Sequence, residues 1–593
     1  MRRTIVFLAA ALALASVQAA YAQSSVHQRL SSLAVQMVYT MAQRHPMDAT
    51  ALGIKGYDDA LETPSRSYKT QDLRLLRGWQ KQLRAITEGG VPLSLVDRDD
   101  ATLLQAQLAQ QINELTIYHQ DEKDYSAPTQ AIVGAIFTQF QHLPASGQSA
   151  ANAVDTAKAW NDIIARLRKA PAYIVAAQAL VTHPGHLQGI VGSEELAGVP
   201  AFFNEALTAA AKAQLSPADF SRFTAARDGT LTTIAQTRRY IVAHVASWPE
   251  NYAIGRRAYD SMLAQEQLLP YNARDVERLG ESELAHGWAE EGWLTALSQS
   301  RGTPFGPQTG GGLAPSGAAL IPYYRDRINE LRSYVVKNNI VTVPDWLGTI
   351  DVVETPSFLQ PVSPGASMNP PRLFSSETTG FYFITPPTSL EGAARRLDMN
   401  QDFDRDRILS TAAHEAMPGH FLQLSIAKRH PDFIRRIQES GVFSEGWAFY
   451  GEEMFVRLGL YGDDLDARLY TARWERVRGA RAIVDAKLAT GEWSYRRAAN
   501  FFAQQTAFTQ GAADAAVAGI ALGPGYVISY TVGRLQLDNL LAEYMRRMGS
   551  RASLLDFHDR LLSYGSTPFA VVAHELLADL NKPLADVRKA ANW

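Results

Sequence analysis

The hydrophobic residues of this chain recur mostly at the spacing of an α-helix. Residues 24–45 place apolar side chains on one helical face, at Leu30, Leu33, Met37, Val38 and Met41. Residues 70–87 and 98–119 repeat the pattern. Residues 215–248 add Ser216 and Pro217, a favourable N-cap and first-turn pair. The first half is therefore predicted to be a series of long amphipathic helices.

The pattern changes between about residues 302 and 387. Residues 302–317 are rich in glycine and proline and predict a loop. Alternating β-branched residues in 338–346 and 349–358 indicate strands, and GFYFITPP (380–387) reads as a short aromatic strand closed by two prolines. Helical spacing then resumes to the C-terminus. The expected fold class is mainly α, with a small β-sheet before the helix that begins near residue 408.

Neither a linker composition nor a fixed-period repeat divides the chain after its first segment. Residues 23–593 are therefore expected to form one mainly helical unit. Its helical first half runs to about residue 300, and residues 301–593 carry the candidate chemistry.

The first 22 residues follow the pattern of a signal peptide. Arg2 and Arg3 precede an apolar run that ends near Val17, and Ala20-Tyr21-Ala22 fits a cleavage site. A mature chain beginning at Gln23, in the periplasm or outside the cell, is predicted. The run is shorter than the roughly 20 residues that span a bilayer, so no stable membrane anchor is expected.

Composition and charge exclude several classes of chemistry. The 593 residues carry a net charge of -3, so no basic surface for nucleic acid is implied. The chain has no cysteine, which excludes disulfides, a thiol nucleophile, thiolate metal ligands and lipid attachment to a cysteine after the apolar run. Any metal ion would have to be bound by His, Asp or Glu.

The segment ILSTAAHEAMPGHFLQLSIAKRH (408–430) contains the strongest candidate for chemistry. His414-Glu415 begins like the H-E-x-x-H helix of zinc peptidases, but Pro418 takes the fourth position and the next histidine is His420. Residues six apart point about 120° away from each other on a continuous helix. Pro418 and Gly419 predict a break, with a positive φ at Gly419, that could return His420 to the side of His414. The alternative is an ordinary helix that ends at Met417.

A downstream carboxylate strengthens the metal interpretation. Glu445 follows Ser444, a candidate N-cap, on a predicted second helix, where zinc peptidases of the glutamate-ligand type place their third ligand. Glu452 lies two turns further along and could orient a histidine, whereas Glu453 is expected to face solvent. A second His-Glu pair, His574-Glu575, has no following histidine and is assigned to a structural helix.

Four segments together resemble the bacterial family called domain of unknown function 885. They are HEAMPGH, SEGWAFYGEEM, RGARAIVDAKLATGEWS and GPGYVISYTVGRLQL, within residues 380–540. Members of that family look like gluzincin-type zinc peptidases with a mostly α-helical fold. The resemblance implies Zn²⁺ on His414, His420 and Glu445, with Glu415 as the general base.

The resemblance also implies contacts with substrate. The strand at 380–387, which contains Tyr382, would be the edge strand that pairs with a bound peptide. Tyr530 matches the family's tyrosine and could stabilise an oxyanion, although Tyr530 sharing a helix face with Gly533 and Leu537 fits core packing equally well. Arg478, Arg481 and Asp485 fall on one helical stripe and are candidates for contacts with the ligands or the substrate.

Three positions depart from the family pattern. Lys487 and Ala489 replace its usual Gly and His, and Tyr526 replaces its usual Gln. The complete metal-binding set favours a secreted zinc metallopeptidase that hydrolyses short peptides, with Glu415 taking the proton of the water that zinc activates. Two alternatives stay open. One is a zinc amidohydrolase acting on a non-peptide amide, and the other is a metal-binding periplasmic protein without turnover, which Ala489 would favour.

Overall fold

Most regular elements of this chain are α-helices, in a computed structural model that describes residues 26–143, 156–303, 305, 314–315, 317–360, 365–385 and 405–593. The predicted signal peptide, residues 1–22, lies outside these ranges. So do Pro386 and Pro387, which were expected to close a strand.

The first half is helical, as predicted. Its first helix covers residues 26–44. Ser216 caps its helix as expected, because its side chain accepts a hydrogen bond from the backbone N–H of Asp219. The following helices are α2 (Pro46–Leu52), α3 (Arg66–Thr87), α4 (Leu95–Asn113), α5 (Ala127–Gln141), α6 (Thr156–Gln178), α7 (His186–Phe202), α8 (Thr208–Gln214), α9 (Pro217–His244), α10 (Arg256–Gln265) and α11 (Ala273–Arg301).

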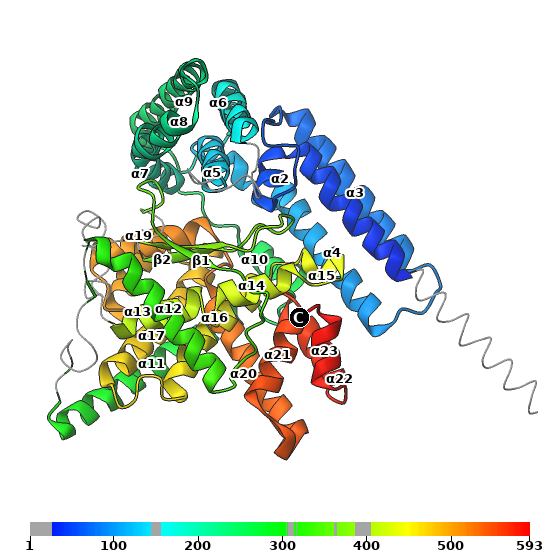
Figure 1. The fold of residues 1–593 in the computed structure, drawn as a ribbon, viewed down its shortest axis with the longest axis vertical. Helices are drawn as coiled ribbons and strands as arrows, with labels where there is room; N and C mark the ends of the chain where they lie inside the picture. The colour runs from blue at the N-terminus through cyan, green and yellow to red at the C-terminus, as the bar shows by residue number, and fades with distance from the viewer. Residues whose placement is uncertain are drawn as a thin grey trace, which may run out of the picture.

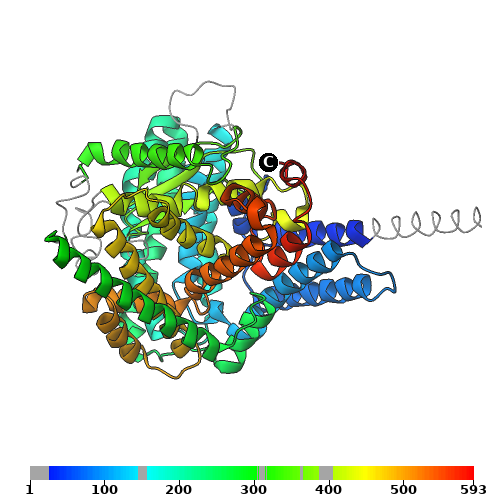
Figure 2. The ribbon, with the colours of Figure 1, turned by 90° about the horizontal axis from the view of Figure 1, so that it is seen from below.

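One further helix, α12 (Leu320–Lys337), precedes the sheet, and helices resume after the sheet and continue to the C-terminus. The later helices are α13 (Arg405–Glu415), α14 (His420–Lys428), α15 (Phe433–Arg436), α16 (Gly441–Arg457), α17 (Leu465–Ala489), α18 (Tyr495–Gln505), α19 (Gln510–Leu522), α20 (Ile528–Met548), α21 (Leu554–Ser563), α22 (Phe569–Ala578) and α23 (Leu584–Ala590). Helices α5 to α9 lie above the sheet in Figure 1, and α11, α12, α13, α16, α17 and α20 lie below it. Figure 2 shows residues 26–44, α3 and α4 projecting from this body as a bundle of parallel rods.

The predicted small sheet is present and has three strands, β1 (Ile350–Glu354), β2 (Ala366–Asn369) and β3 (Gly380–Ile384). Their order is β1-β3-β2. β1 runs parallel to β3 with Ile350 opposite Gly380, and β2 runs antiparallel to β3 with Ala366 opposite Ile384. The expectation that β3 is an edge strand was therefore wrong, because both of its edges are hydrogen-bonded within the sheet.

The structure differs from the sequence-based expectations about strands in two further places. Residues 338–346 form no strand, and their apolar pattern arises because Ile340 and Val341 are buried in the core. The short strand β2, of sequence ASMN, was not predicted, since it lacks the β-branched alternation that marks strands.

The central strand β3 joins two hydrophobic cores. Tyr382 and Ile384 belong to the core shared with α12, α13, α16 and α20. Phe383 points to the other face and belongs to the core of α5, α6, α7 and α9. The helices that carry the candidate metal ligands are anchored in the first of these cores through residues such as Ala413, Phe421 and Trp447.

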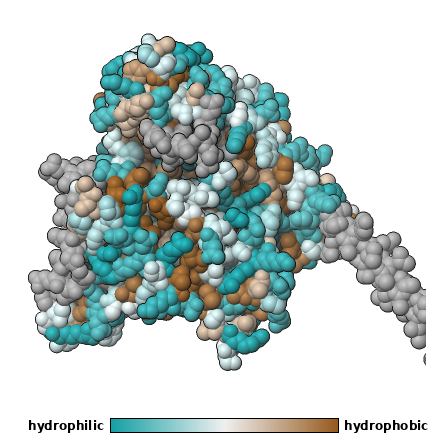
Figure 3. Space-filling view, in the orientation of Figure 1, coloured by the Kyte–Doolittle hydropathy of each residue, from teal (hydrophilic) through white to brown (hydrophobic). Residues whose placement is uncertain are grey.

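Polar side chains dominate the face of the molecule seen in Figure 3, with smaller hydrophobic patches between them. Across the described ranges, no helix combines the length and the apolar character needed to cross a bilayer.

Candidate metal centre

The helix that carries His414 is interrupted where the sequence predicts it. α13 ends at Glu415 and α14 begins at His420. Between them, the N–H of Met417 donates to the carbonyl of Ala412 and the N–H of Gly419 to that of Ala413, each over 3.0 Å. These bonds reach back five and six residues, so the regular ladder does not continue through the turn.

Gly419 is required there for a reason other than the one expected. Its φ is −63°, so the predicted positive φ was wrong. A Cβ atom at this position would lie 1.7 Å from the carbonyl oxygen of His414. The turn folds back tightly onto the end of α13, and the indole N–H of Trp447 donates to the carbonyl of Pro418 over 2.8 Å.

The turn brings the two histidines and the downstream glutamate together. The rings of His414 and His420 lie 4.8 Å apart at an angle of 88°. Oε2 of Glu445, on α16, lies 3.3 Å from Nε2 of His414 and 3.5 Å from Nε2 of His420. These three side chains, distant in sequence, thus offer ligand atoms that all lie within 4.8 Å of one another.

These residues fit a zinc ion. Ligands about 2.0–2.2 Å from a tetrahedral ion are separated by roughly 3.3–3.6 Å, which matches the two distances to Glu445. Oε2 of Glu445 is buried, and no group in the described residues makes a hydrogen bond to it. A buried carboxylate oxygen facing two imidazole nitrogens without a donor is the arrangement that a cation would complete.

A hydrogen-bonded pair, Glu452 and Arg478, fixes the orientation of His414. Oε1 of Glu452 lies 2.6 Å from Nδ1 of His414, and Arg478 of α17 binds both carboxylate oxygens of Glu452, over 2.6 and 3.1 Å. In a neutral His414 whose Nδ1 donates its proton to Glu452, Nε2 would have a lone pair for a cation held between it and Glu445. Burial opposes a charge on His414, yet the neighbouring carboxylates of Glu445 and Glu452 raise its pKa to about 10. The surroundings therefore favour positive charge at this point.

Glu415 and Tyr530 lie beside the candidate ligands and line the same cavity. Burial raises the pKa of Glu415, although His414 and His420 oppose this effect, so its carboxylate is a stronger base than usual. The ring of Tyr530 stacks on that of His414 with centroids 5.9 Å apart. Tyr530 thus packs against a candidate ligand and also borders the open space.

The cavity has a volume of about 1190 Å³. Its walls come from α7, α13, α17 and α19 and from the start of β2, and in Figure 1 α7 lies above the helices of the metal site. Arg478 and Arg481 of the predicted stripe line it. This volume suits a small ligand or a short peptide rather than a folded protein.

Two residues that were predicted to contact the ligands or the substrate lie away from the cavity. Tyr382 is fully buried and packs edge-on against Tyr324, with centroids 5.8 Å apart, and it does not line the cavity because it points into the core beneath β3. The strand at the cavity is β2, through Ala366. Asp485 is buried and accepts hydrogen bonds from the N–H of Gly525, so it fixes the loop before α20 rather than facing the cavity.

Tyr526, on that loop, was not predicted to act at the site. Its hydroxyl donates to Oε1 of Glu445 over 2.6 Å. The only sequence signal was that Tyr526 replaces the family's usual Gln.

Two expectations about α16 were wrong. Its N-cap is Ser440, whose side chain accepts from the N–H of Phe443, so α16 begins one turn before Ser444. Glu453 does not face solvent, because it is 3% exposed and pairs with Arg457 over 2.8 Å and with Arg534 over 3.2 Å.

The other departures from the family pattern lie away from the cavity. Lys487 pairs with Glu277 and Glu492, over 2.6 and 2.8 Å. Ala489 is buried in the main core. Neither residue lines the cavity, so neither changes its chemistry directly.

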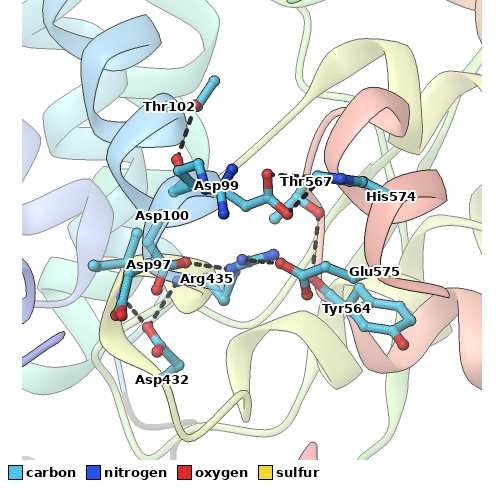
Figure 4. A network of polar contacts seen from close by, with 12 residues as sticks. Asp97, Asp99, Asp100, Thr102, Asp432, Arg435, Tyr564, Thr567, His574 and Glu575 are labelled. Atoms are coloured by element: carbon cyan, nitrogen blue, oxygen red, sulfur yellow. Dashed lines mark hydrogen bonds and ion pairs between the residues drawn. The ribbon is translucent and has the colours of Figure 1, made fainter. Parts of the chain in front are cut away.

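The second His-Glu pair is structural, as expected. Figure 4 shows His574 and Glu575 of α22 facing α4 and α15. Nδ1 of His574 lies 3.2 Å from Asp99, and Glu575 accepts from Arg435 over 2.5 Å. Arg435 also donates to Asp100 over 2.6 Å.

The same region holds another group of possible metal ligands, namely His27, Asp100 and Asp432. The guanidinium of Arg435 already supplies a positive charge to Asp100, which disfavours a metal cation at that point. In the group around His414, Arg478 is paired with Glu452, and no guanidinium forms an ion pair with Glu445 among the described residues.

The fold and the site together define a mainly helical protein in which two histidines and a glutamate converge beside a large cavity that His414 and Glu415 line. The chain belongs to a family of bacterial proteins of unknown function (DUF885), whose model matches residues 46–576.

Two solved structures share this fold. One, from Shewanella oneidensis, is described as a "putative lipoprotein of unknown function" and has 19% sequence identity and a TM-score of 0.71, with 92% of this chain and 99% of that chain covered. The other, described as a "putative lipoprotein" from Colwellia psychrerythraea, has 17% identity and a TM-score of 0.75, with 94% and 100% covered. No curated protein matches the chain.

Proposed function

We propose that this protein is a zinc-dependent metallopeptidase that hydrolyses short peptides. The observation that carries the proposal is the convergence of His414, His420 and Glu445 on one point, at the side of a cavity that His414 and Glu415 line. Imidazole and carboxylate ligands of this number, next to a buried carboxylate base, are typical of zinc hydrolases.

The side chains have distinct roles in this proposal. His414, His420 and Glu445 would hold Zn²⁺, which when bound supplies Lewis acidity that polarises a carbonyl and lowers the pKa of water. Glu415 accepts a proton from the attacking water and delivers it to the leaving amine. The Tyr530 hydroxyl donates a hydrogen bond to the oxygen on which negative charge develops. Among the described residues β2 pairs with a strand on one side only, so its other edge offers backbone groups to an extended peptide.

We infer that the protein is exported. Its first 22 residues have the composition of a signal peptide, and the two structural relatives are described as putative lipoproteins. This chain has no cysteine, so attachment through a lipidated cysteine is not open to it. A periplasmic or secreted protein is the form that agrees with both observations.

The experiment that tests the peptidase proposal combines metal analysis with digestion of a peptide library followed by mass spectrometry. We expect about one zinc per chain and cleavage of short peptides. Glu415→Gln should keep its zinc and lose at least roughly a hundredfold in rate, because only the proton acceptor is removed.

The second His-Glu pair supplies the matched control. His414→Ala should lose zinc and activity, whereas His574→Ala, at a helical histidine that also precedes a glutamate but lacks the other ligands, should keep both. A wild-type protein that contains no zinc, or a Glu415→Gln variant that hydrolyses at the parental rate, would overturn the proposal. Cleavage of matched non-peptide amides but of no peptide would favour the amidohydrolase alternative.

A further inference from the structure

Two arginines of α17 that lie one turn apart have different partners. Arg478 is bound by both oxygens of Glu452. Arg481 lines the same cavity, where the charge of Glu445 attracts it, but no carboxylate in the described part of the chain lies within ion-pair distance of it. Its nearest aromatic neighbours are Trp474 and Tyr530, whose ring centroids lie 5.6 and 5.7 Å from its guanidinium carbon.

An unpaired guanidinium in such a place predicts an anionic ligand. Removing a charge from water costs several kcal/mol unless a partner of opposite charge compensates it. Burial lowers the pKa of Arg481, in keeping with this cost, but arginine stays protonated at any physiological pH. Its planar fork of donors matches a carboxylate, which it can bind through two parallel hydrogen bonds.

Arg481 lies near the end of the cavity that holds His414 and Glu415. Tyr530 neighbours both His414 and Arg481, because its ring is 5.9 Å from that of His414 and 5.7 Å from the guanidinium carbon of Arg481. A peptide residue spans at most about 3.3–3.6 Å. A carboxylate one or two residues beyond a carbonyl bound near Glu415 can therefore reach Arg481.

Acidic residues on another wall of the cavity would orient the two ends of a bound peptide. Glu194 and Glu195 of α7, together with Glu250, line the cavity. Burial raises the pKa of Glu195 to about 7, so Glu194 and Glu250 supply most of the negative charge, which repels a carboxylate and attracts an ammonium group. A peptide with free termini would therefore direct its carboxyl end toward Arg481 and its amino end toward α7.

We propose that Arg481 binds the C-terminal carboxylate of the substrate, so that the enzyme removes one or two residues from the carboxyl end of short peptides. This inference rests on the proposed function and names the substrate class for that site. Arg481 is then a specificity-determining residue, and an amidated or internally extended peptide lacks the group that it recognises.

Hydrolysis of paired peptides tests the inference. Peptides of one sequence that end in a free acid or in an amide are compared for kcat/KM with the zinc-loaded wild type. We expect the acid to be preferred by roughly 10–100-fold, the usual contribution of a hydrogen bond to a charged group. Arg481→Gln should remove the preference, mainly through a higher KM for the acid, and Arg481→Lys should retain part of it. Zinc content and Tm of both variants show whether they are folded.

A binding measurement separates this inference from the proposed function. Calorimetry with the Glu415→Gln variant should show tighter binding of the acid than of the amide, and adding Arg481→Gln should equalise them. Equal cleavage of both peptides by the wild type would overturn the inference and leave the peptidase intact. If Glu415→Gln binds the acid and the amide equally tightly, the inference is overturned whether or not the wild type hydrolyses peptides. An equal loss of kcat on both peptides in Arg481→Gln would also overturn it, because Arg481 would then act on the oxyanion.

Discussion

The hydroxyl of Tyr526 holds one oxygen of Glu445 while the other oxygen faces the two histidines. The hydrogen bond to Oε1 is 2.6 Å long, and Oε2 lies 3.3 Å from His414 and 3.5 Å from His420. A carboxylate fixed at one oxygen cannot rotate freely about its last bond. Tyr526 therefore orients a candidate metal ligand from outside the ligand set.

Removing this hydroxyl should weaken zinc binding. We expect Tyr526→Phe to lose roughly tenfold or more in zinc affinity, as is typical when a partner of a ligand is removed. Tyr526→Gln, which installs the residue usual in the family, should lose less because its amide can donate. Competition with a chromogenic chelator measures both. Tyr495→Phe, whose hydroxyl donates to the carbonyl of Asp514 in the same cavity, is the control and should leave zinc binding unchanged. Unchanged affinity in Tyr526→Phe would contradict the role given to Tyr526.

Glu452 and Glu453 are neighbours in sequence with separate tasks. Glu452 contacts His414 and Arg478, whereas Glu453 contacts Arg457 and Arg534. Glu452→Ala should reduce zinc affinity by roughly 10–100-fold. Glu453→Ala should keep the zinc but lower the free energy of unfolding by about 1–3 kcal/mol, because it leaves a cavity and removes one partner of Arg534.

Metal analysis and thermal unfolding of the two variants, each freed of metal for the unfolding experiment, separate the effects. Loss of zinc from Glu453→Ala with full retention in Glu452→Ala would reverse the assignment. A metal-free comparison is needed because bound zinc stabilises the folded state by itself.

Local signals in the sequence predicted the helices and the turn. Helical spacing and caps such as Ser216 depend on residues a few positions apart, so the pattern of one segment suffices. The interruption between His414 and His420 also followed from a local cause, the Pro418-Gly419 pair. The family resemblance then joined Glu445 to the same site.

The errors have non-local causes. Glu453 looked solvent-facing because its partner Arg534 lies on α20, some eighty residues later. The resemblance implied that β3 is an edge strand, and its sequence does not reveal that β2 pairs with it. The contact between Tyr526 and Glu445, 81 residues apart, depends on how Asp485 fixes the loop before α20. Such pairings are set by tertiary packing rather than by the composition of either segment.

His558 should make stability depend on pH. It is fully buried, with Nδ1 2.7 Å from the carbonyl of Ile340 and Nε2 2.9 Å from the hydroxyl of Tyr450. Burial lowers its pKa to about 4, although the bond to Ile340 opposes this. The unfolded chain then binds the proton more readily than the folded one. Stability is therefore full above about pH 6.5 and falls as the pH drops toward 4, by roughly 3 kcal/mol in all.

Thermal unfolding of the wild type and of His558→Asn between pH 7 and 4.5 tests this. The asparagine amide can still donate to Ile340 but does not titrate. The Tm advantage of the wild type at pH 7 should shrink as the pH falls. A difference that stays constant over this range would show that His558 does not titrate in the unfolding reaction.

Gly419 should be needed for zinc binding although it touches no metal. A methyl group there would lie 1.7 Å from the carbonyl oxygen of His414 and 2.4 Å from that of Ala413, so the turn would have to open and carry His420 away. Gly419→Ala is expected to lower zinc affinity by at least about tenfold, as measured by chelator competition.

Gly451, in α16, is a matched control, because its Cβ would lie 3.9 Å from the same Ala413 oxygen, an ordinary contact. Gly451→Ala should keep zinc and gain up to about 1 kcal/mol of stability, since alanine favours a helix interior. If both variants bind zinc as tightly as the parent, the close approach at Gly419 does not position His420, and the turn is held by other contacts, such as that of Trp447 with Pro418.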